Sequence, residues 1–262
     1  MTEVKNIILT GARGFIGSYL LDELLRLDYK IFAISRKKIL SKNSEKIVWI
    51  SWENFYSELP KNLSSFAIIH LATDYGQDSS SKEVFDANFN IPLKFFKFCL
   101  DKKINKIIAA DTFFGKSKFK YTHMLDYIES KRLLVDSTRE LIQGYNSFFI
   151  NLRLEHVFGP SDNPNKFIPT LLKSLKEGSE NIDLTDGYQK RDFTYIHDVV
   201  SAFIAVLNHI PAEKFIECEV GTGISSSLKS FCLTLVKACK VEKRILNFGA
   251  LSHRKDEIMN SS

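Results

Sequence analysis

The sequence predicts an α/β fold, in which a doubly wound parallel sheet carries a small C-terminal lobe. Apolar strand-like runs alternate with helical patterns through the first half of the chain. Repeated β-α units of this kind require right-handed crossovers and a sheet buried on both faces. A glycine-rich turn follows the first apolar run directly, and beyond Gly159-Pro160 the alternation gives way to segments rich in Pro, Asn and Asp. Together these observations are typical of a Rossmann-type sheet followed by a second lobe.

Six apolar runs of strand length are expected to form the sheet: Asn6–Thr10, Lys30–Ser35, Ile47–Ser51, Ala67–Leu71, Lys106–Ala110 and Phe148–Leu154. The helical patterns between them cover Ser18–Leu27, Glu83–Asp101 and Leu125–Tyr145. In a sheet of this type the ligand lies beyond the carboxyl ends of the strands. The functional site is therefore expected at that edge.

The C-terminal part of the chain has a different texture. Helices are expected over Lys166–Glu177 and Ser227–Lys240, with a turn at Thr185-Asp186-Gly187 and a strand-like run at Arg244–Phe248. We divide the chain into a first domain, residues 1–160 with 186–222 returning to it, and a lobe of residues 161–185 and 223–262. The lobe is expected to cover the cleft of the sheet and to bind the substrate.

Composition excludes several classes of function. The formal net charge is +5, and we interpret the Lys-rich segments as solvated faces rather than a nucleic-acid groove. The four cysteines show no CxxC spacing and the six histidines no HxH or HExxH arrangement, so thiols in a reducing compartment and no metal site are expected. Without a signal-peptide layout or a membrane-length apolar run, the sequence predicts a cytoplasmic protein.

The turn after the first strand has the spacing of a dinucleotide site. Gly11 permits a tight turn, Gly14 lets the backbone approach a pyrophosphate, and Gly17 lets the following helix pack against the strand. The N-terminus of the following helix then presents free N–H groups to the phosphates, and Phe15 and Ile16 are expected among the cofactor contacts. A glycine-rich turn that binds nothing is the alternative.

Two arginines indicate which dinucleotide is bound. The second strand is followed by Arg36 and lysines, with no acid to accept hydrogen bonds from a ribose 2′-hydroxyl. Arg36 and Arg13 are both placed to pair with a 2′-phosphate, for which a guanidinium is suited. The expected cofactor is therefore NADP(H), although each arginine alone is equally consistent with a solvated side chain.

Tyr127 and Lys131 lie one helical turn apart, so their side chains share a face. With the glycine turn upstream, this pair resembles the YxxxK signature of the short-chain dehydrogenase/reductase superfamily. IIHLAT (residues 68–73), NLRLEHVFGP (151–160), DGYQKRDFTYIHDVV (186–200) and VGTG (220–223) resemble segments of its extended, nucleotide-sugar branch. Within that branch, the similarity is greatest to enzymes that reduce CDP-4-keto-3,6-dideoxyglucose. The resemblance runs to residue 260, where the family continues, so the lobe is expected to be C-terminally incomplete.

The resemblance implies roles for the catalytic residues. Tyr127 would exchange a proton with the substrate, while Lys131 would stabilise its phenolate and contact the nicotinamide ribose. The family's third member, a Ser or Thr, corresponds to Ala110, which lacks a hydroxyl. Thr112 lies two residues on and on the same face of the strand, so it is the expected substitute; a loop-capping hydroxyl is the alternative. The branch's dehydratases have Asp-Glu where this chain has Asp111-Thr112, which argues against dehydration.

The same resemblance assigns the remaining contacts. Cofactor contacts are expected from Leu71, Ala72 and Thr73 at the end of the fourth strand. Substrate contacts are expected from Asp111, His156, Asn165, Lys166, Arg191 and Arg254, with the two arginines on the diphosphate. A buried structural His156 paired with Glu155 is an alternative, and Arg153 is interpreted as structural.

These expectations combine into a function. The sequence favours an NADPH-dependent reductase of the 4-keto group of a nucleotide-linked deoxysugar, in a route to a surface polysaccharide such as a lipopolysaccharide O-antigen. An epimerase of the same branch and a non-catalytic NADP-binding protein of the same fold are the alternatives. A homodimer through the two long helices is expected from the family.

Overall fold

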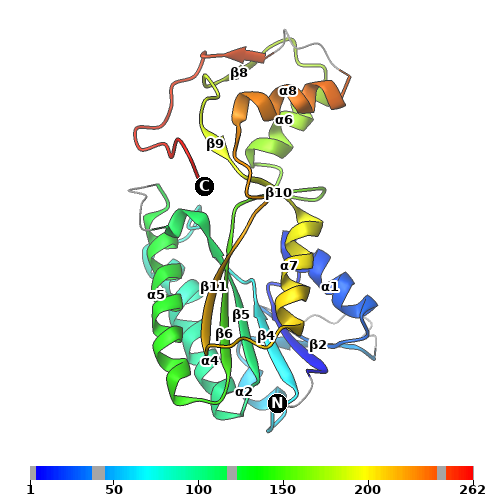
Figure 1. Ribbon diagram of the computed structural model, residues 1–262, viewed down its shortest axis with the longest axis vertical. Helices are drawn as coiled ribbons and strands as arrows, with labels where there is room; N and C mark the ends of the chain where they lie inside the picture. Colours follow the sequence, from blue (N-terminus) through cyan, green and yellow to red (C-terminus); the bar gives the residue numbers. More distant parts are fainter. Residues whose placement is uncertain (1–3, 37–44, 117–122, 241–245, 262) are drawn as a thin grey trace.

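The computed structural model of the chain describes residues 4–36, 45–116, 123–240 and 246–261 (Figure 1). Its centre is a sheet of seven parallel strands, which confirms the predicted doubly wound Rossmann-type fold. In spatial order the strands are β11 (Phe215–Val220), β6 (Phe148–Leu154), β5 (Lys106–Thr112), β4 (Phe66–His70), β1 (Asn6–Thr10), β2 (Lys30–Ser35) and β3 (Ile47–Ser51). The order reverses between β1 and β4, and ligands bind at such a switch point.

Helices cover both faces of this sheet (Figure 1). One face packs against α1 (Phe15–Arg26) and α7 (Ile196–Asn208), and the other against α2 (Phe55–Glu58), α4 (Ile91–Asp101) and α5 (Leu125–Leu141). The short helix α3 (Ser81–Phe85) packs against α5. The two faces hold separate apolar cores. Strands such as β4, whose five residues are all buried, read as continuous apolar runs because both of their faces are covered.

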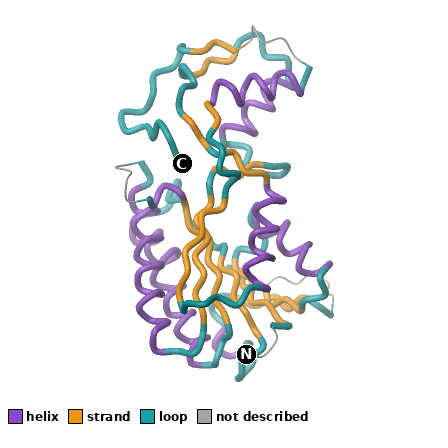
Figure 2. The backbone as a smooth tube through the Cα atoms, in the orientation of Figure 1, coloured by secondary structure: helices purple, strands orange, loops and turns teal. Residues whose placement is uncertain are grey.

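A second lobe lies beyond the carboxyl edge of the sheet (Figure 2). It contains α6 (Phe167–Lys176), α8 (Leu228–Ala238) and the parallel pair β8 (Ile182–Leu184) and β13 (Leu246–Phe248), packed around a small apolar cluster of their own. Two short pairs join the lobes: β7 (His156–Phe158) with β10 (Phe193–Tyr195), and β9 (Lys190–Arg191) with β12 (Ser226–Ser227). Residues 249–261 then run back from the lobe to the sheet edge (Figure 1).

Several elements differ from the expectations. The sheet has a seventh strand, β11, which was not among the six expected runs, and α1 begins at Phe15 rather than at Ser18. Strand β5 extends two residues beyond Ala110, to Thr112. The helix expected over Glu83–Asp101 is divided by a π-helical segment, Asp86–Asn90, between α3 and α4. The strand expected at Arg244–Phe248 appears as β13, and its first two residues lie outside the described part of the chain.

No helix in the described ranges is long and apolar enough to cross a membrane.

Candidate active site

The glycine turn lies at the carboxyl end of β1 and touches the end of β4. Gly11 has a φ of +71°, and a Cβ on it would come within 2.7 Å of the Ala72 backbone nitrogen. A Cβ on Gly17 would come within 2.0 Å of the Gly11 carbonyl oxygen. These contacts explain why both positions need glycine. Gly14 is exposed and precedes α1 without a side-chain cap, which leaves the N–H groups at Phe15 and Ile16 available to an anion.

Thr10 and His70 fix the loop that faces the glycine turn. The Thr10 hydroxyl accepts hydrogen bonds from the backbone N–H groups of Leu71 and Ala72, both at 3.1 Å. Its proton therefore goes to Nδ1 of His70, 2.8 Å away, which makes Nε2 the protonated nitrogen of the ring. Burial lowers the pKa of His70 to about 3, with the nearby Lys131 charge adding to the shift. The imidazole is therefore neutral.

Arg13 and Arg36 follow β1 and β2, which are paired neighbours in the sheet, and both residues are exposed. Their recognition of a 2′-phosphate remains a prediction.

Tyr127 and Lys131 project from the first turns of α5 toward the end of β5. Tyr127 is 6% exposed, and Lys131 Nζ donates a hydrogen bond to the Ala110 carbonyl oxygen at 2.6 Å. Burial lowers the pKa of Lys131 to about 8, while the Asp111 charge opposes that shift. The pair is thus withdrawn from water and held against the strand that was expected to supply the third member.

Thr112 lies at the end of β5 and contacts Tyr127. Burial holds the pKa of the Tyr127 phenol well above its usual value, and the charge interaction with Tyr75 adds to this. A side-chain hydrogen bond with Thr112 acts in the opposite direction. The Thr112 hydroxyl also accepts a hydrogen bond from the Phe114 N–H at 3.4 Å, which is the contact of a loop cap, and its catalytic role remains a prediction.

Asn88 is a site residue that the sequence did not reveal. It lies in the π-helical segment and is 1% exposed. Its side-chain oxygen accepts from the Thr73 hydroxyl and the Asp74 N–H, while its amide nitrogen donates to the Asp74 carbonyl and to Ser130. One amide therefore ties the loop after β4 to the helix that carries Tyr127. π-Helical segments often occur near functional sites, but no residue type marks them in a sequence, so the sequence offered no signal for Asn88.

Asp111 points into the neighbouring strands. Its carboxylate accepts from Asn151 at 3.2 Å and pairs with Arg153 at 3.4 Å, and Arg153 also pairs with Glu217 at 2.8 Å. Arg153 thus has the structural contacts expected of it. Asp111 was expected to contact the substrate, but its carboxylate already binds Asn151 and Arg153.

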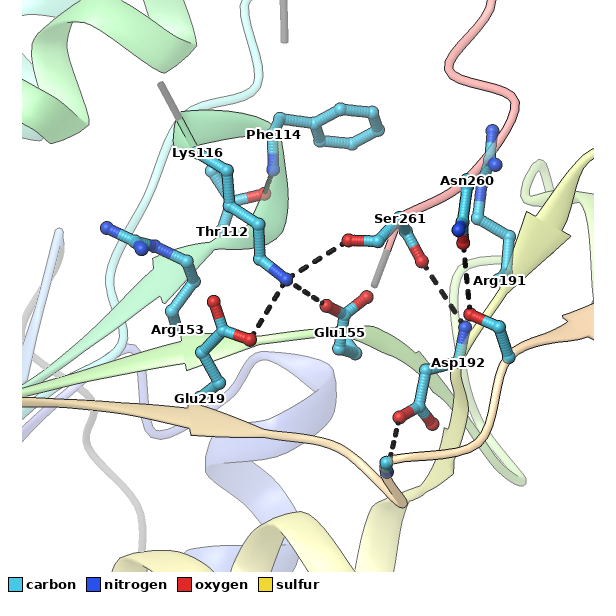
Figure 3. Close-up of polar contacts among 12 residues, drawn as sticks. Thr112, Phe114, Lys116, Arg153, Glu155, Arg191, Asp192, Glu219, Asn260 and Ser261 are labelled. Atoms are coloured by element: carbon cyan, nitrogen blue, oxygen red, sulfur yellow. Dashed lines mark hydrogen bonds and ion pairs between the residues drawn. The ribbon is translucent and has the colours of Figure 1, made fainter. Parts of the chain in front are cut away.

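Lys116 forms a second polar cluster under the C-terminal segment (Figure 3). Its ammonium donates to Glu155 at 2.7 Å, to Glu219 at 3.1 Å and to the Ser261 carbonyl at 3.0 Å. Because Glu155 pairs with Lys116, it is not the partner proposed for His156. Burial lowers the pKa of His156 to about 3, so its ring is neutral between Phe113 and Phe193. Sequence reasoning missed Lys116, since a single lysine after a turn carries no signal.

The two arginines expected to bind the diphosphate differ in burial. Arg191 is 6% exposed, and its guanidinium donates to the Glu257 carboxylate and to the Ile258 carbonyl of the C-terminal segment. Arg254 is exposed in the same segment. Asn165 and Lys166 are exposed at the start of α6, where Lys166 pairs with Asp162 at 2.9 Å.

Within the part of the chain that the structure describes, no group of three or more His, Cys, Asp or Glu side chains is arranged to hold a metal ion.

The sequence and the fold of the chain are similar to those of known proteins. The profile of the NAD dependent epimerase/dehydratase family matches residues 7–219. The chain is 36% identical to the CDP-abequose synthase of Salmonella typhimurium, over 100% of this chain and 90% of that protein. It is 27% identical to the dTDP-4-dehydro-6-deoxyglucose reductase of Escherichia coli, over 88% and 81% respectively. The solved structure of MoeE5 in complex with UDP-glucuronic acid and NAD matches with a TM-score of 0.79 at 19% identity, over 97% of this chain and 88% of that chain.

Proposed function

The chain belongs to the NAD dependent epimerase/dehydratase family, and we propose that it is an NADPH-dependent reductase of a nucleotide-linked 4-keto deoxysugar. The proposed substrate is CDP-4-keto-3,6-dideoxyglucose, in a route to a surface polysaccharide. The full-length similarity to CDP-abequose synthase supports this substrate class. The observation that supports the reaction type is the position of Tyr127 and Lys131 at the end of β5, where Tyr127 is hydrogen-bonded to Thr112 and Lys131 to the Ala110 carbonyl.

The residues at the sheet edge fit a dinucleotide. Gly11 and Gly17 let the turn pack closely against the end of β4 and the start of α1, and the uncapped start of α1 offers N–H groups to phosphate. Arg13 and Arg36 favour NADP(H) over NAD, because a 2′-phosphate meets a guanidinium in bidentate geometry. When bound, NADPH supplies the hydride. Replacing both arginines by Ser should raise the KM for NADPH about 100-fold and leave that for NADH within a factor of about three.

Each protein group then has one task in the reduction. Tyr127 donates its phenolic proton to the sugar carbonyl oxygen as C4 gains the hydride, so one hydride and one proton complete the alcohol. Thr112 holds that oxygen and the phenol in register through its hydroxyl. Lys131, charged below its pKa of about 8, stabilises the phenolate that the proton transfer leaves. The rate of reduction should therefore fall as the pH rises through about 8.

The second lobe is proposed to hold the nucleotide. We assign residues 161–185 and 223–262 to this lobe, and Arg191 and Arg254 are the cations proposed for the diphosphate. Because Arg191 is paired with Glu257, a diphosphate at Arg191 replaces that carboxylate. His156, Asn165 and Lys166 are proposed as further contacts.

The assembly and compartment are proposed on separate grounds. Exposed Ile91 on α4 and exposed Leu125 and Leu133 on α5 favour a homodimer through these helices. Light scattering should give twice the mass of one chain. The four cysteines are free thiols, which suits the reducing cytoplasm.

Deuterium transfer separates a reductase from an epimerase. The protein should move deuterium from 4-deuterated NADPH to carbon 4 of the sugar, one atom for each molecule reduced, as read by mass spectrometry. An epimerase would change the sugar's configuration with a retained cofactor and incorporate no label from added NADPH.

A further inference from the structure

A loop after β4 holds an aromatic side chain against Tyr127. The ring of Tyr75 lies 5.0 Å from that of Tyr127, centroid to centroid, with the planes inclined by 34°. Tyr75 is 46% exposed, whereas Tyr127 is 6% exposed. The proposed proton donor therefore has a large, half-open aromatic surface at its side, and the reaction as described above gives that surface no task.

The fold fixes the position of Tyr75. One oxygen of the Asp74 carboxylate accepts from the Gly76 N–H at 2.8 Å, and the other accepts from the Ser79 hydroxyl at 2.7 Å. Asn88 binds the Asp74 backbone on both sides, as described above. Gly76 has a φ of +73°, which suits glycine at this turn. Hydrogen bonds therefore hold the backbone on both sides of Tyr75, at Asp74 and at Gly76.

Tyr75 and Tyr127 line a cavity of about 220 Å³. Its remaining wall comes from Gly76, Ser79, Val84, Met124, Leu125 and Asp126. The apolar part of this lining comes from Tyr75, Met124 and Leu125, because Val84 is 1% exposed. The Ser79 hydroxyl is engaged with Asp74, and Asp126 adds a carboxylate to the polar part of the wall. A cavity of this size beside the proton donor accommodates part of a sugar ring.

We infer that Tyr75, with Met124 and Leu125, is a specificity-determining wall that receives the deoxygenated carbons of the sugar. This inference rests on the proposed function, in which Tyr127 acts at carbon 4. Two carbons near that centre lack hydroxyl groups in the proposed substrate: the C3 methylene, which is bonded to C4, and the C6 methyl, which is attached to the neighbouring C5. Such carbons lose nothing on leaving water for an aromatic and aliphatic wall, whereas a hydroxyl loses its hydrogen bonds.

A binding measurement tests the wall without requiring turnover. We would measure the Kd of CDP-6-deoxyglucose and of CDP-glucose, which differ by one hydroxyl, by calorimetry in the presence of NADP. The wild-type protein should bind the deoxy compound about 10-fold to 100-fold more tightly. Tyr75→Phe should keep that ratio, because it keeps the ring, and Tyr75→Ser should reduce it to about threefold or less.

Tyr56→Ser is the matched control, because Tyr56 is 55% exposed on α2 and does not line the cavity. It should leave the ratio of the two Kd values unchanged. Equal binding of the two sugars by wild type, or an unchanged ratio in Tyr75→Ser, overturns the wall. Failure of the proposed reduction is a different result: NADPH would then persist with the keto sugar while the Kd ratios stand.

Discussion

At the scale of single residues, the account depends on the proposal that the Thr112 hydroxyl replaces the hydroxyl that Ala110 lacks. Because β5 continues through Thr112, the period of the strand keeps that side chain on the face of Ala110. The sequence sufficed to suggest this, since only the alternation of a strand was needed. It did not show whether the loop would begin before Thr112, which depends on the pairing of β5 with β6 up to Leu154.

Thr112→Val removes the hydroxyl and keeps the shape of the side chain. We expect kcat for the reduction to fall about 100-fold, the magnitude found when one hydrogen-bond donor at a reacting oxygen is lost. Thr112→Ser should retain activity within about fivefold, because it keeps the hydroxyl. Steady-state kinetics with NADPH measure both. Equal activity of the Val and Ser variants would show that Thr112 only caps the loop.

His70 makes stability depend on pH. Its pKa is about 3 in the folded protein and about 6.5 when unfolded, so the unfolded state binds more protons between these values. The contribution to stability is complete above pH 6.5 and is lost as the pH falls toward 3, by up to about 1.4 kcal/mol per pH unit.

Urea unfolding at pH 6.5, 5.5 and 5.0 measures this slope in wild type and His70→Gln. The variant should be less stable at every pH, since Thr10 loses its partner, and its stability should change less with pH. Parallel curves for the two proteins would contradict the assignment of a neutral His70.

At the scale of elements, the long helix before β5 shows where sequence patterns stop being informative. Its apolar periodicity predicts one helix from Glu83 to Asp101; α4 lies within that range, and α3 begins two residues before it, at Ser81. The π-helical segment between them adds no residue type that marks it, yet it brings Asn88 against the loop after β4. Pairs of two or three residues, such as β9 with β12, were also missed, because they are too short to show a period.

Lys106 joins the start of β5 to the end of α7. It lies at the start of β5, 3% exposed, and its ammonium donates to the carbonyl oxygens of Val206, Leu207 and His209 at the end of α7. The Lys106 ammonium accordingly satisfies carbonyl groups that the end of a helix leaves unpaired, and its positive charge is attracted to the negative end of the helix dipole.

Lys106→Met should lower the free energy of unfolding by about 2–3 kcal/mol, because it strands buried carbonyl groups. Lys97→Met is the control: Lys97 pairs with Asp101 on the surface of α4, and such a pair contributes about 1 kcal/mol at most. Urea denaturation compares the two variants. If both lower stability equally, Lys106 is not the link between β5 and α7.

At the scale of the whole molecule, the site lies where the sheet, the second lobe and the C-terminal segment meet. The sequence was sufficient for six of the seven strands of the sheet, for the glycine turn and for placing Tyr127 and Lys131 on one helix, because each follows from a local period or spacing. It was insufficient for contacts between distant segments. The pairing of Arg191 with Glu257, and of Lys116 with the Ser261 carbonyl, joins residues that only the tertiary fold brings together.

Nicotinamide absorbance tests the central claim most directly. The protein is mixed with NADPH and CDP-4-keto-3,6-dideoxyglucose made in situ, beside a Tyr127→Phe variant shown by fluorescence titration to bind NADPH normally. We predict that wild type oxidises one NADPH for each sugar reduced. The variant should be about 10³-fold slower, within the range for loss of a general acid. NADPH left unchanged by folded, cofactor-bound wild type, or equal rates for the two proteins, would contradict the proposed reductase.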